Sequence, residues 1–125
     1  MDYALIGTIA RLTNTAPNWD REVTRAVGTA RACAIAALIR ALGAEVDYAD
    51  LRGIGLFQAK PGLPDRPLRA TNAIVRDLPS VKRIYEQEGR AIAPVRVDIE
   101  SRGTLVAAVD LTFEVGRYEP RLPPR

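Results

Sequence analysis

The clearest pattern of apolar and polar positions lies in the second half of the chain. Apolar residues alternate with charged ones over residues 91–100, and a second alternating run covers residues 104–115. A period of two predicts β-strands that bury one face and leave the other in contact with water. Ser101, Arg102 and Gly103 separate the two runs, so the sequence predicts an antiparallel hairpin with a tight turn at these three residues.

A long segment with helical character precedes these strands. Residues 18–42 contain no proline, Asn18 is a potential N-cap, and Gly43 is a common C-terminal stop. Gly28 interrupts the segment, so the helix starts either near Asn18 or as late as Gly28. Residues 32–39 carry no charge. A helical stretch that is apolar on all sides predicts a helix buried on all sides.

Two further strands are predicted between this helix and the hairpin. They cover residues 46–59 and 68–76, and a turn-rich stretch at residues 60–67 separates them. Gly53 and Gly55 lie inside the first of the two strands. Glycines in a strand interior indicate a bulge or a sharp bend, which a curved sheet requires.

The remaining segments are shorter. Residues 79–88 predict a polar helix that ends at Gly89. Residues 3–12 are apolar without a clean period and fit either a first strand or a short helix. We expect one α+β domain over residues 1–118, in which an antiparallel sheet curves around the apolar helix. A Pro- and Arg-rich tail follows at residues 119–125.

Composition excludes several kinds of chemistry. The chain has 125 residues, no histidine and a single cysteine, Cys33. These counts exclude Ser-His-Asp and Cys-His catalysis, internal disulfides and the common His-based or multi-thiolate metal sites. We therefore expect no metal and no cofactor, and Cys33 is expected to be a small core residue.

Charge and hydropathy limit the classes of partner that are expected for this chain. The net charge is +3, and the positive residues are almost all arginines that are interleaved with acids. Without a basic run or a known motif, nucleic acid is not an expected partner. Residues 32–39 are too few to span a bilayer, and residues 1–3 lack the positive region of a signal peptide. Together with the single cysteine, which allows no internal disulfide, these features predict a cytoplasmic protein with no membrane partner.

The order of the elements resembles the hot-dog fold, and within it the acyl-coenzyme A thioesterase-like branch. The helix over residues 28–43 and the strand after it resemble the central helix and following strand of that branch. Lys60-Pro61-Gly62 is similar to the turn that ends this strand, and residues 88–91 resemble the start of the last hairpin. The resemblance implies a homodimer or higher homo-oligomer with pockets for an acyl-coenzyme A or acyl-carrier thioester at the subunit interface.

The resemblance also implies where a thioester would bind. In this branch, backbone N–H groups at the N-terminal end of the central helix face the thioester carbonyl, and Gly28 and Thr29 take that position here. Thr29 alternatively serves as a local cap. The branch usually carries a carboxylate two turns into the helix, where this chain has Ile-Ala-Ala at residues 35–37. The chain thus resembles a thioesterase that lacks its usual helix carboxylate, with weak or absent hydrolysis expected.

Asn72 and Asp50 are the remaining candidates for orienting a catalytic water. Asn72 shares strand parity with Leu68, Ala70 and Ile74, which are expected to face inward, and a buried amide needs hydrogen-bond partners. The alternative is that Asn72 caps a bulge or bonds to the backbone. Asp50 follows the helix near a possible pocket mouth, and its alternative is a solvated strand end.

Two other interpretations stay open. The same fold can act as a non-catalytic module that binds a lipid or polyketide, or as a scaffold subunit, and the missing helix carboxylate favours this interpretation. A cystatin-like cone fold binding a hydrophobic small molecule would place the pocket inside one subunit. Arg69, Arg76 and Arg90 are candidates for contacting coenzyme A phosphates, or else ordinary surface arginines.

Overall fold

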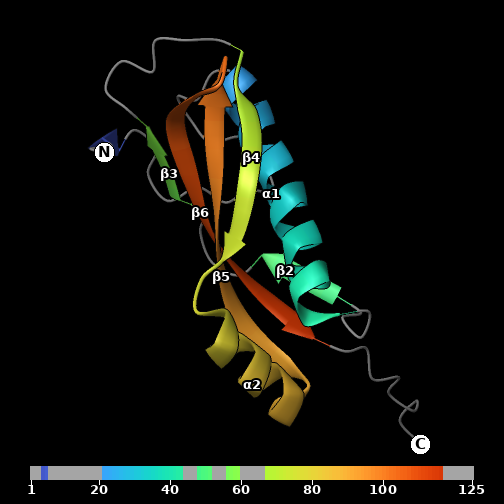
Figure 1. Ribbon diagram of the computed structural model, residues 1–125. Helices are drawn as coiled ribbons and strands as arrows, with labels where there is room; N and C mark the ends of the chain where they lie inside the picture. The colour runs from blue at the N-terminus through green and yellow to red at the C-terminus, as the bar shows by residue number, and fades with distance from the viewer. Residues whose placement is uncertain (1–3, 6–20, 44–47, 52–55, 60–66, 117–125) are drawn as a thin grey trace, which may run out of the picture.

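The computed structural model describes residues 4–5, 21–43, 48–51, 56–59 and 67–116. Within these residues the chain is an α+β structure with an antiparallel, curved sheet and two helices, of which α1 runs along one face of the sheet and α2 lies at one end (Figure 1). The sheet has the strand order β1-β3-β6-β5-β4, and β2 also pairs with β6. The elements are β1 (Ala4–Leu5), α1 (Arg21–Leu42), β2 (Tyr48–Leu51), β3 (Leu56–Ala59), β4 (Arg69–Val75), α2 (Leu78–Glu88), β5 (Arg90–Ser101) and β6 (Thr104–Gly116).

The β5–β6 hairpin is the longest pairing in the sheet and confirms the predicted strands. Ser101 pairs with Thr104, and the two residues between them, Arg102 and Gly103, have φ values of 53° and 81°. Positive φ at both central residues is the conformation that tight hairpin turns require. Alternate residues of both strands are buried and form the inner face of the sheet: Ala91, Ala93, Val95, Val97, Ile99, Ala107, Val109, Leu111, Phe113 and Val115.

Helix α1 starts at Arg21, so the later start at Gly28 is wrong. Its end is as predicted, because Gly43 has φ of 85° and its N–H donates to the Ile39 carbonyl at 2.9 Å. The proposed cap Asn18 lies outside the described residues. One face of α1 packs on β4 and β5. The buried residues of that face are Val23, Ala26, Val27, Ala30, Ala34, Ala37 and Leu38.

The predicted burial of α1 on all sides is wrong. Ala32, Ala36 and Ile39 are exposed, and 44% of the Ile39 surface is accessible to solvent. The helix contacts the sheet with one face only, so the uncharged middle of α1 is half core and half surface. The lack of charge in residues 32–39 therefore did not show that both faces of the helix are buried, because one face is in the core and the other is exposed.

The single strand predicted over residues 46–59 is divided into β2 and β3, which both pair with β6 in antiparallel orientation. Leu51 and Leu56 are five positions apart, whereas their partners on β6, Phe113 and Asp110, are three apart. The β2–β6 and β3–β6 pairings therefore do not share one continuous register. The predicted bend at Gly53 and Gly55 lies outside the described residues, as do most of residues 3–12, of which Ala4–Leu5 form β1.

Helix α2 agrees with the polar helix predicted over residues 79–88. It ends at Gly89, which has φ of 73° and donates its N–H to the Tyr85 carbonyl at 2.8 Å. Val81 and Tyr85 are buried and join the core cluster formed by α1 and the inner face of the sheet. This contact fixes α2 against the start of β5. The C-terminal tail at residues 119–125 lies outside the described residues.

Glu22 links the start of α1 to the start of β4. Its carboxylate Oε1 accepts a hydrogen bond from the Leu68 N–H at 3.1 Å and contacts the Arg25 guanidinium at 3.2 Å. A carboxylate in the first turn also interacts favourably with the helix dipole. Because Leu68 is 46 residues away in the chain, this bond fixes one element against the other.

Two glycine substitutions should have opposite effects on stability. Gly28 is an exposed helix-interior residue, and an added Cβ meets nothing within 4 Å. Gly28→Ala should raise the free energy of unfolding by about 1 kcal/mol, because alanine has the higher helix propensity. Gly89→Ala should lower it by about 1 kcal/mol, because φ is positive there. Urea denaturation measures both, and equal shifts of the same sign would contradict this assignment of the helix ends.

Removing the Glu22 carboxylate should destabilise the fold. Glu22→Ala should lower the free energy of unfolding by about 1.5 kcal/mol, the lower range for a hydrogen bond to a charged group, because Glu22 is partly exposed. Glu22→Gln keeps an acceptor and should lose less. The matched control is Glu86→Ala on the exposed face of α2, with a change below about 0.5 kcal/mol. Equal losses for Glu22→Ala and Glu86→Ala in urea denaturation would disprove the link.

Candidate functional site

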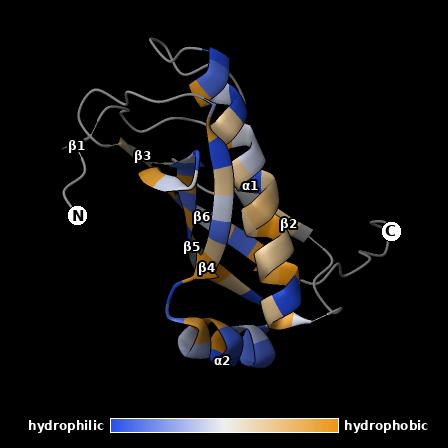
Figure 2. Ribbon diagram, turned by 45° about the horizontal axis from the view of Figure 1, so that its top comes forward, coloured by the Kyte–Doolittle hydropathy of each residue, from blue (hydrophilic) through white to orange (hydrophobic). Residues whose placement is uncertain are grey.

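The exposed face of α1 carries a row of small and apolar residues. Gly28, Ala32, Ala36 and Ile39 follow one another at intervals of four, four and three residues, which places them on one side of a helix. We call these four residues the apolar stripe. Figure 2 shows the same feature as a hydrophobic middle of α1 between hydrophilic ends. A solvent-exposed row of this kind is a candidate surface for an apolar ligand.

Arginines flank the apolar stripe. Arg21 and Arg25 are exposed near its N-terminal end, and Arg40 follows Ile39. The Arg25 side chain is 67% exposed although it pairs with Glu22. The N-terminal end of a helix also carries the positive end of the helix dipole. The helix dipole therefore adds to the positive charge of Arg21 at this end of α1, while Glu22 offsets part of the charge of Arg25.

Gly28 and Thr29 lie within α1 and not at its start, so their predicted position is wrong. They are the eighth and ninth residues of a helix that begins at Arg21. At that depth a helix uses its N–H groups for its own hydrogen-bond ladder, and only the first four remain unpaired. The Thr29 hydroxyl donates to the Arg25 carbonyl at 3.1 Å. The helix has no spare N–H donors at these two residues.

Asn72 lies at a β-bulge with its side chain exposed, so the inward orientation predicted for it is wrong. On β5, Asp98 pairs with Thr71 and Val97 pairs with Ala73, which leaves Asn72 as the extra residue, with φ of 48°. The bulge reverses the strand parity. Leu68 and Ala70 contact the core before the bulge, Ala73 and Val75 contact it afterwards, and Ile74 is 57% exposed.

Asp50 lies on β2 in register with Glu114 of β6, and Glu114 is in turn in register with Ile92 of β5. Asn72 is next to the β4 position that pairs with Val97. Five residues of extended strand separate Ile92 from Val97, which is about 17 Å. The structure therefore does not bring Asn72 and Asp50 together as one catalytic group.

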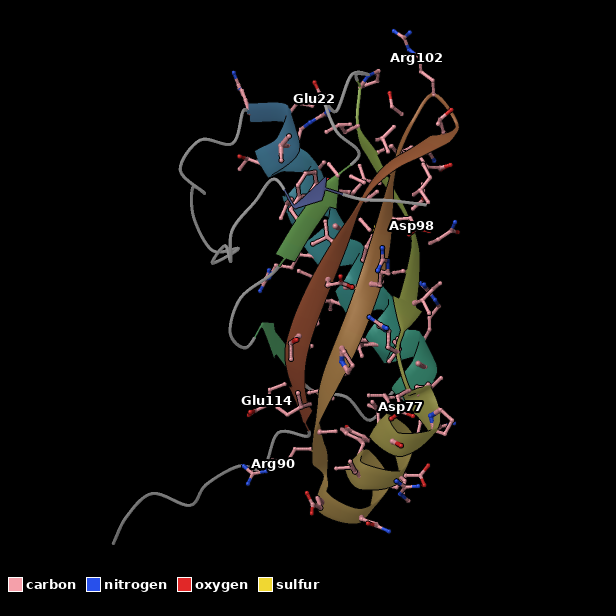
Figure 3. All side chains as sticks on the ribbon, turned by 90° about the vertical axis from the view of Figure 1, so that its left-hand side faces the viewer. Glu22, Asp77, Arg90, Asp98, Arg102 and Glu114 are labelled. Atoms are coloured by element: carbon pink, nitrogen blue, oxygen red, sulfur yellow. The ribbon has the colours of Figure 1, made fainter. Side chains whose placement is uncertain are left out.

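A concavity of about 360 Å³ opens beside α2, and its volume lies in the range of small-molecule sites. It combines two isoleucines with three charged side chains. Figure 3 shows the labelled side chains of Arg90 and Glu114 extending to the same side at the lower end of the sheet. The residues that line the concavity are Ile84, Glu88, Arg90, Ala91, Ile92 and Glu114.

The three arginine candidates have different surroundings. Arg90 lines the concavity. Arg76 lies 3.9 Å from the Asp110 carboxylate, which is also 3.8 Å from Arg96 on the neighbouring strand. This cluster lies across the outer face of the sheet, and the Asp110 carboxylate already supplies a counter-charge to Arg76. Arg69 is exposed on β4.

The described residues hold no group of three or more acidic or cysteine side chains that could bind a metal ion. Cys33 is partly buried and packs against the core cluster, in agreement with a structural role. Of the helices in the described ranges, none has the length and apolar character needed to cross a membrane. No protein-family model, no curated protein and no solved structure matches this chain.

Sequence reasoning did not identify the apolar stripe or the concavity as surfaces. Small residues at positions 28, 32 and 36 show the spacing of one helix face. The sequence alone does not show which face of α1 packs on the sheet and which stays exposed. Ile92 gave a clearer signal. It has the parity of Arg96 and Asp98, so it is an isoleucine on the polar face of β5.

The bulge at Asn72 makes a specific stability prediction. Asn72→Ala should lower the free energy of unfolding by about 1 kcal/mol, because alanine is strained at positive φ, whereas Asn72→Gly should be nearly neutral. Arg69→Ala, at an exposed position of the same strand, is the control and should change stability by less than about 0.5 kcal/mol. Urea denaturation of the three variants tests this, and equal destabilisation by alanine and glycine at position 72 would contradict the bulge.

Proposed function

We propose that this chain is a hot-dog-like, cytoplasmic domain that binds an acyl thioester, with the acyl chain lying along the apolar stripe of α1. The carrier is coenzyme A or an acyl-carrier protein. The observation that carries the proposal is the exposed apolar stripe with Arg21 and Arg25 at one end. An antiparallel sheet curving past a single long helix is compatible with the hot-dog arrangement.

The charge arrangement suits an amphiphile with an anionic head. The phosphates of coenzyme A or of a phosphopantetheine carrier would lie near Arg21 and Arg25, where the helix dipole adds positive potential. The acyl chain would then extend over Ala32, Ala36 and Ile39. Gly28 and Ile39 are eleven positions apart, which corresponds to about 16 Å along a helix. Small side chains at the stripe let a ligand approach the helix backbone closely.

A second copy of the chain would complete this site. A helix face is convex, whereas small-molecule sites bury most of the ligand surface. An acyl chain on the stripe therefore needs a facing wall, and a homodimer or higher homo-oligomer supplies one. Burial between two subunits would stabilise the complex by about 25 cal/mol for each Å² of apolar surface removed from water.

Binding fits the residues of α1 better than hydrolysis does. Gly28 and Thr29 lie inside the helix ladder, and the Thr29 hydroxyl already donates to the Arg25 carbonyl. The positions where the resembled branch carries its carboxylate are Ile35, Ala36 and Ala37. Neither a spare oxyanion donor nor a base is thus provided by this stretch of the helix. The proposal is a carrier-bound acyl-chain binder, with release of free thiol no faster than the uncatalysed reaction.

A charge in the apolar stripe should abolish acyl binding. Ala36→Glu places a carboxylate at an exposed helical position, where glutamate is well tolerated. It should weaken binding of a non-hydrolysable palmitoyl-coenzyme A thioether at least tenfold, because the carboxylate would be desolvated beside the acyl chain. Isothermal titration calorimetry measures the affinity.

Gln87→Glu is the matched control, since it adds the same charge at an exposed position of α2. It should leave the affinity unchanged. Equal affinity of Ala36→Glu and the unmodified protein, or no binding of the thioether to either, would reject the proposal. Release of thiol from palmitoyl-coenzyme A well above the uncatalysed rate would instead favour a hydrolase.

A further inference from the structure

The C-terminal end of α2 has an unusual concentration of negative charge. Its last turn contains Glu86 and Glu88 and no basic residue. The helix dipole and the unpaired terminal carbonyls already give this end a negative potential, which normally favours lysine or arginine there. Glu88 lines the concavity at this end. A cationic group bound beside Glu88 would add to the relief of this negative potential that Arg90, two residues later in the chain, can provide.

Two isoleucines also line the same concavity. They are Ile84 and Ile92, which are 39% and 50% exposed. The two side chains come from α2 and β5, so the tertiary fold brings them together. Exposed isoleucines that converge in a hollow provide a surface for an aliphatic group.

Arg90 supplies the third feature of the concavity. It starts β5 directly after Gly89, and it forms no ion pair with Glu88 in the part of the chain that the structure describes. A guanidinium is well suited to bind a carboxylate with two hydrogen bonds. The concavity therefore combines the carboxylates of Glu88 and Glu114, the guanidinium of Arg90 and the two isoleucines.

We propose that this concavity binds a small aliphatic zwitterion, that is, an aliphatic α-amino acid of about the size of leucine. The ammonium group lies at the C-terminal end of α2 beside Glu88, the carboxylate lies at Arg90, and the aliphatic side chain covers Ile84 and Ile92. The volume of about 360 Å³ accommodates a molecule of this size.

This site is separate from the surface proposed for the acyl chain. Ile92 and Glu114 have the parity opposite to the buried residues of β5 and β6, so the concavity opens on the outer face of the sheet. Helix α1 packs on the inner face. The inference does not depend on acyl binding, and either can fail without the other.

Three ligands test the proposed chemistry against each other. L-leucine carries both charges, 3-methylbutylamine lacks the carboxylate, and 4-methylpentanoate lacks the ammonium group. Each is titrated to about 20 mM into the isotope-labelled full chain while amide chemical shifts are followed by NMR. We expect saturable shifts at Ile84, Arg90 and Ile92 with leucine. Each of the other two ligands should bind about tenfold more weakly, because each loses one charge-assisted hydrogen bond.

Two variants, each with a control, test which charged side chain binds which end of leucine. Glu88→Gln should weaken leucine binding about tenfold and leave binding of 4-methylpentanoate unchanged. Its control, Glu86→Gln, alters the same helical turn outside the concavity and should bind leucine normally. Arg90→Gln should weaken leucine but not 3-methylbutylamine, and Arg83→Gln on the exposed side of α2 is its control.

The proposal is overturned if leucine gives no saturable shifts at these residues, or if the three ligands bind equally well. It is also overturned if Glu88→Gln and Glu86→Gln have the same effect on leucine affinity. Amide spectra of each variant are compared with that of the unmodified protein, so that a loss of folding is recognised. A variant that unfolds is replaced by Ile92→Thr, which keeps the strand and should weaken leucine binding because it removes apolar surface from the concavity.

Discussion

The packing of α1 on the inner face of the sheet, mainly on β4 and β5, is the contact on which the rest of the structure depends. Ala30, Ala34 and Leu38 of α1 are fully buried, as are Val97 and Ile99 of β5 in the same core cluster. Burying one valine or leucine side chain contributes about 1.5–3 kcal/mol, whereas an exposed ion pair such as Arg25–Glu22 contributes about 1 kcal/mol or less. Apolar burial therefore determines where the helix lies, and polar contacts such as Glu22 with Leu68 adjust its register.

One-sided packing of this helix also creates the two candidate surfaces. Because α1 contacts the sheet with one face, its apolar stripe remains exposed on the opposite side. Because α1 occupies the inner face of the sheet, Ile92 and Glu114 remain accessible on the outer face beside α2. The surface proposed for the acyl chain and the concavity proposed for the zwitterion thus follow from a single contact, and they lie on different sides of the sheet.

Local patterns predicted the elements better than the site. Alternation identified β5 and β6, and Gly43, Gly89 and Gly103 marked ends and turns because positive φ is a local requirement. The bulge at Asn72 is not visible locally, since a single extra residue reverses strand parity only when the partner strand is known. The concavity likewise joins residues of α2, β5 and β6, and no spacing along the chain predicts that meeting.

The central claim is that an acyl chain lies on the exposed face of α1. Isotope-filtered NOE spectroscopy of the labelled protein with unlabelled palmitoyl-coenzyme A thioether tests it most directly. The account predicts NOEs from the acyl methylenes to the methyl groups of Ala32, Ala36 and Ile39. NOEs confined to Ile84 and Ile92 at the concavity, or none from a folded protein at saturating ligand, would contradict it.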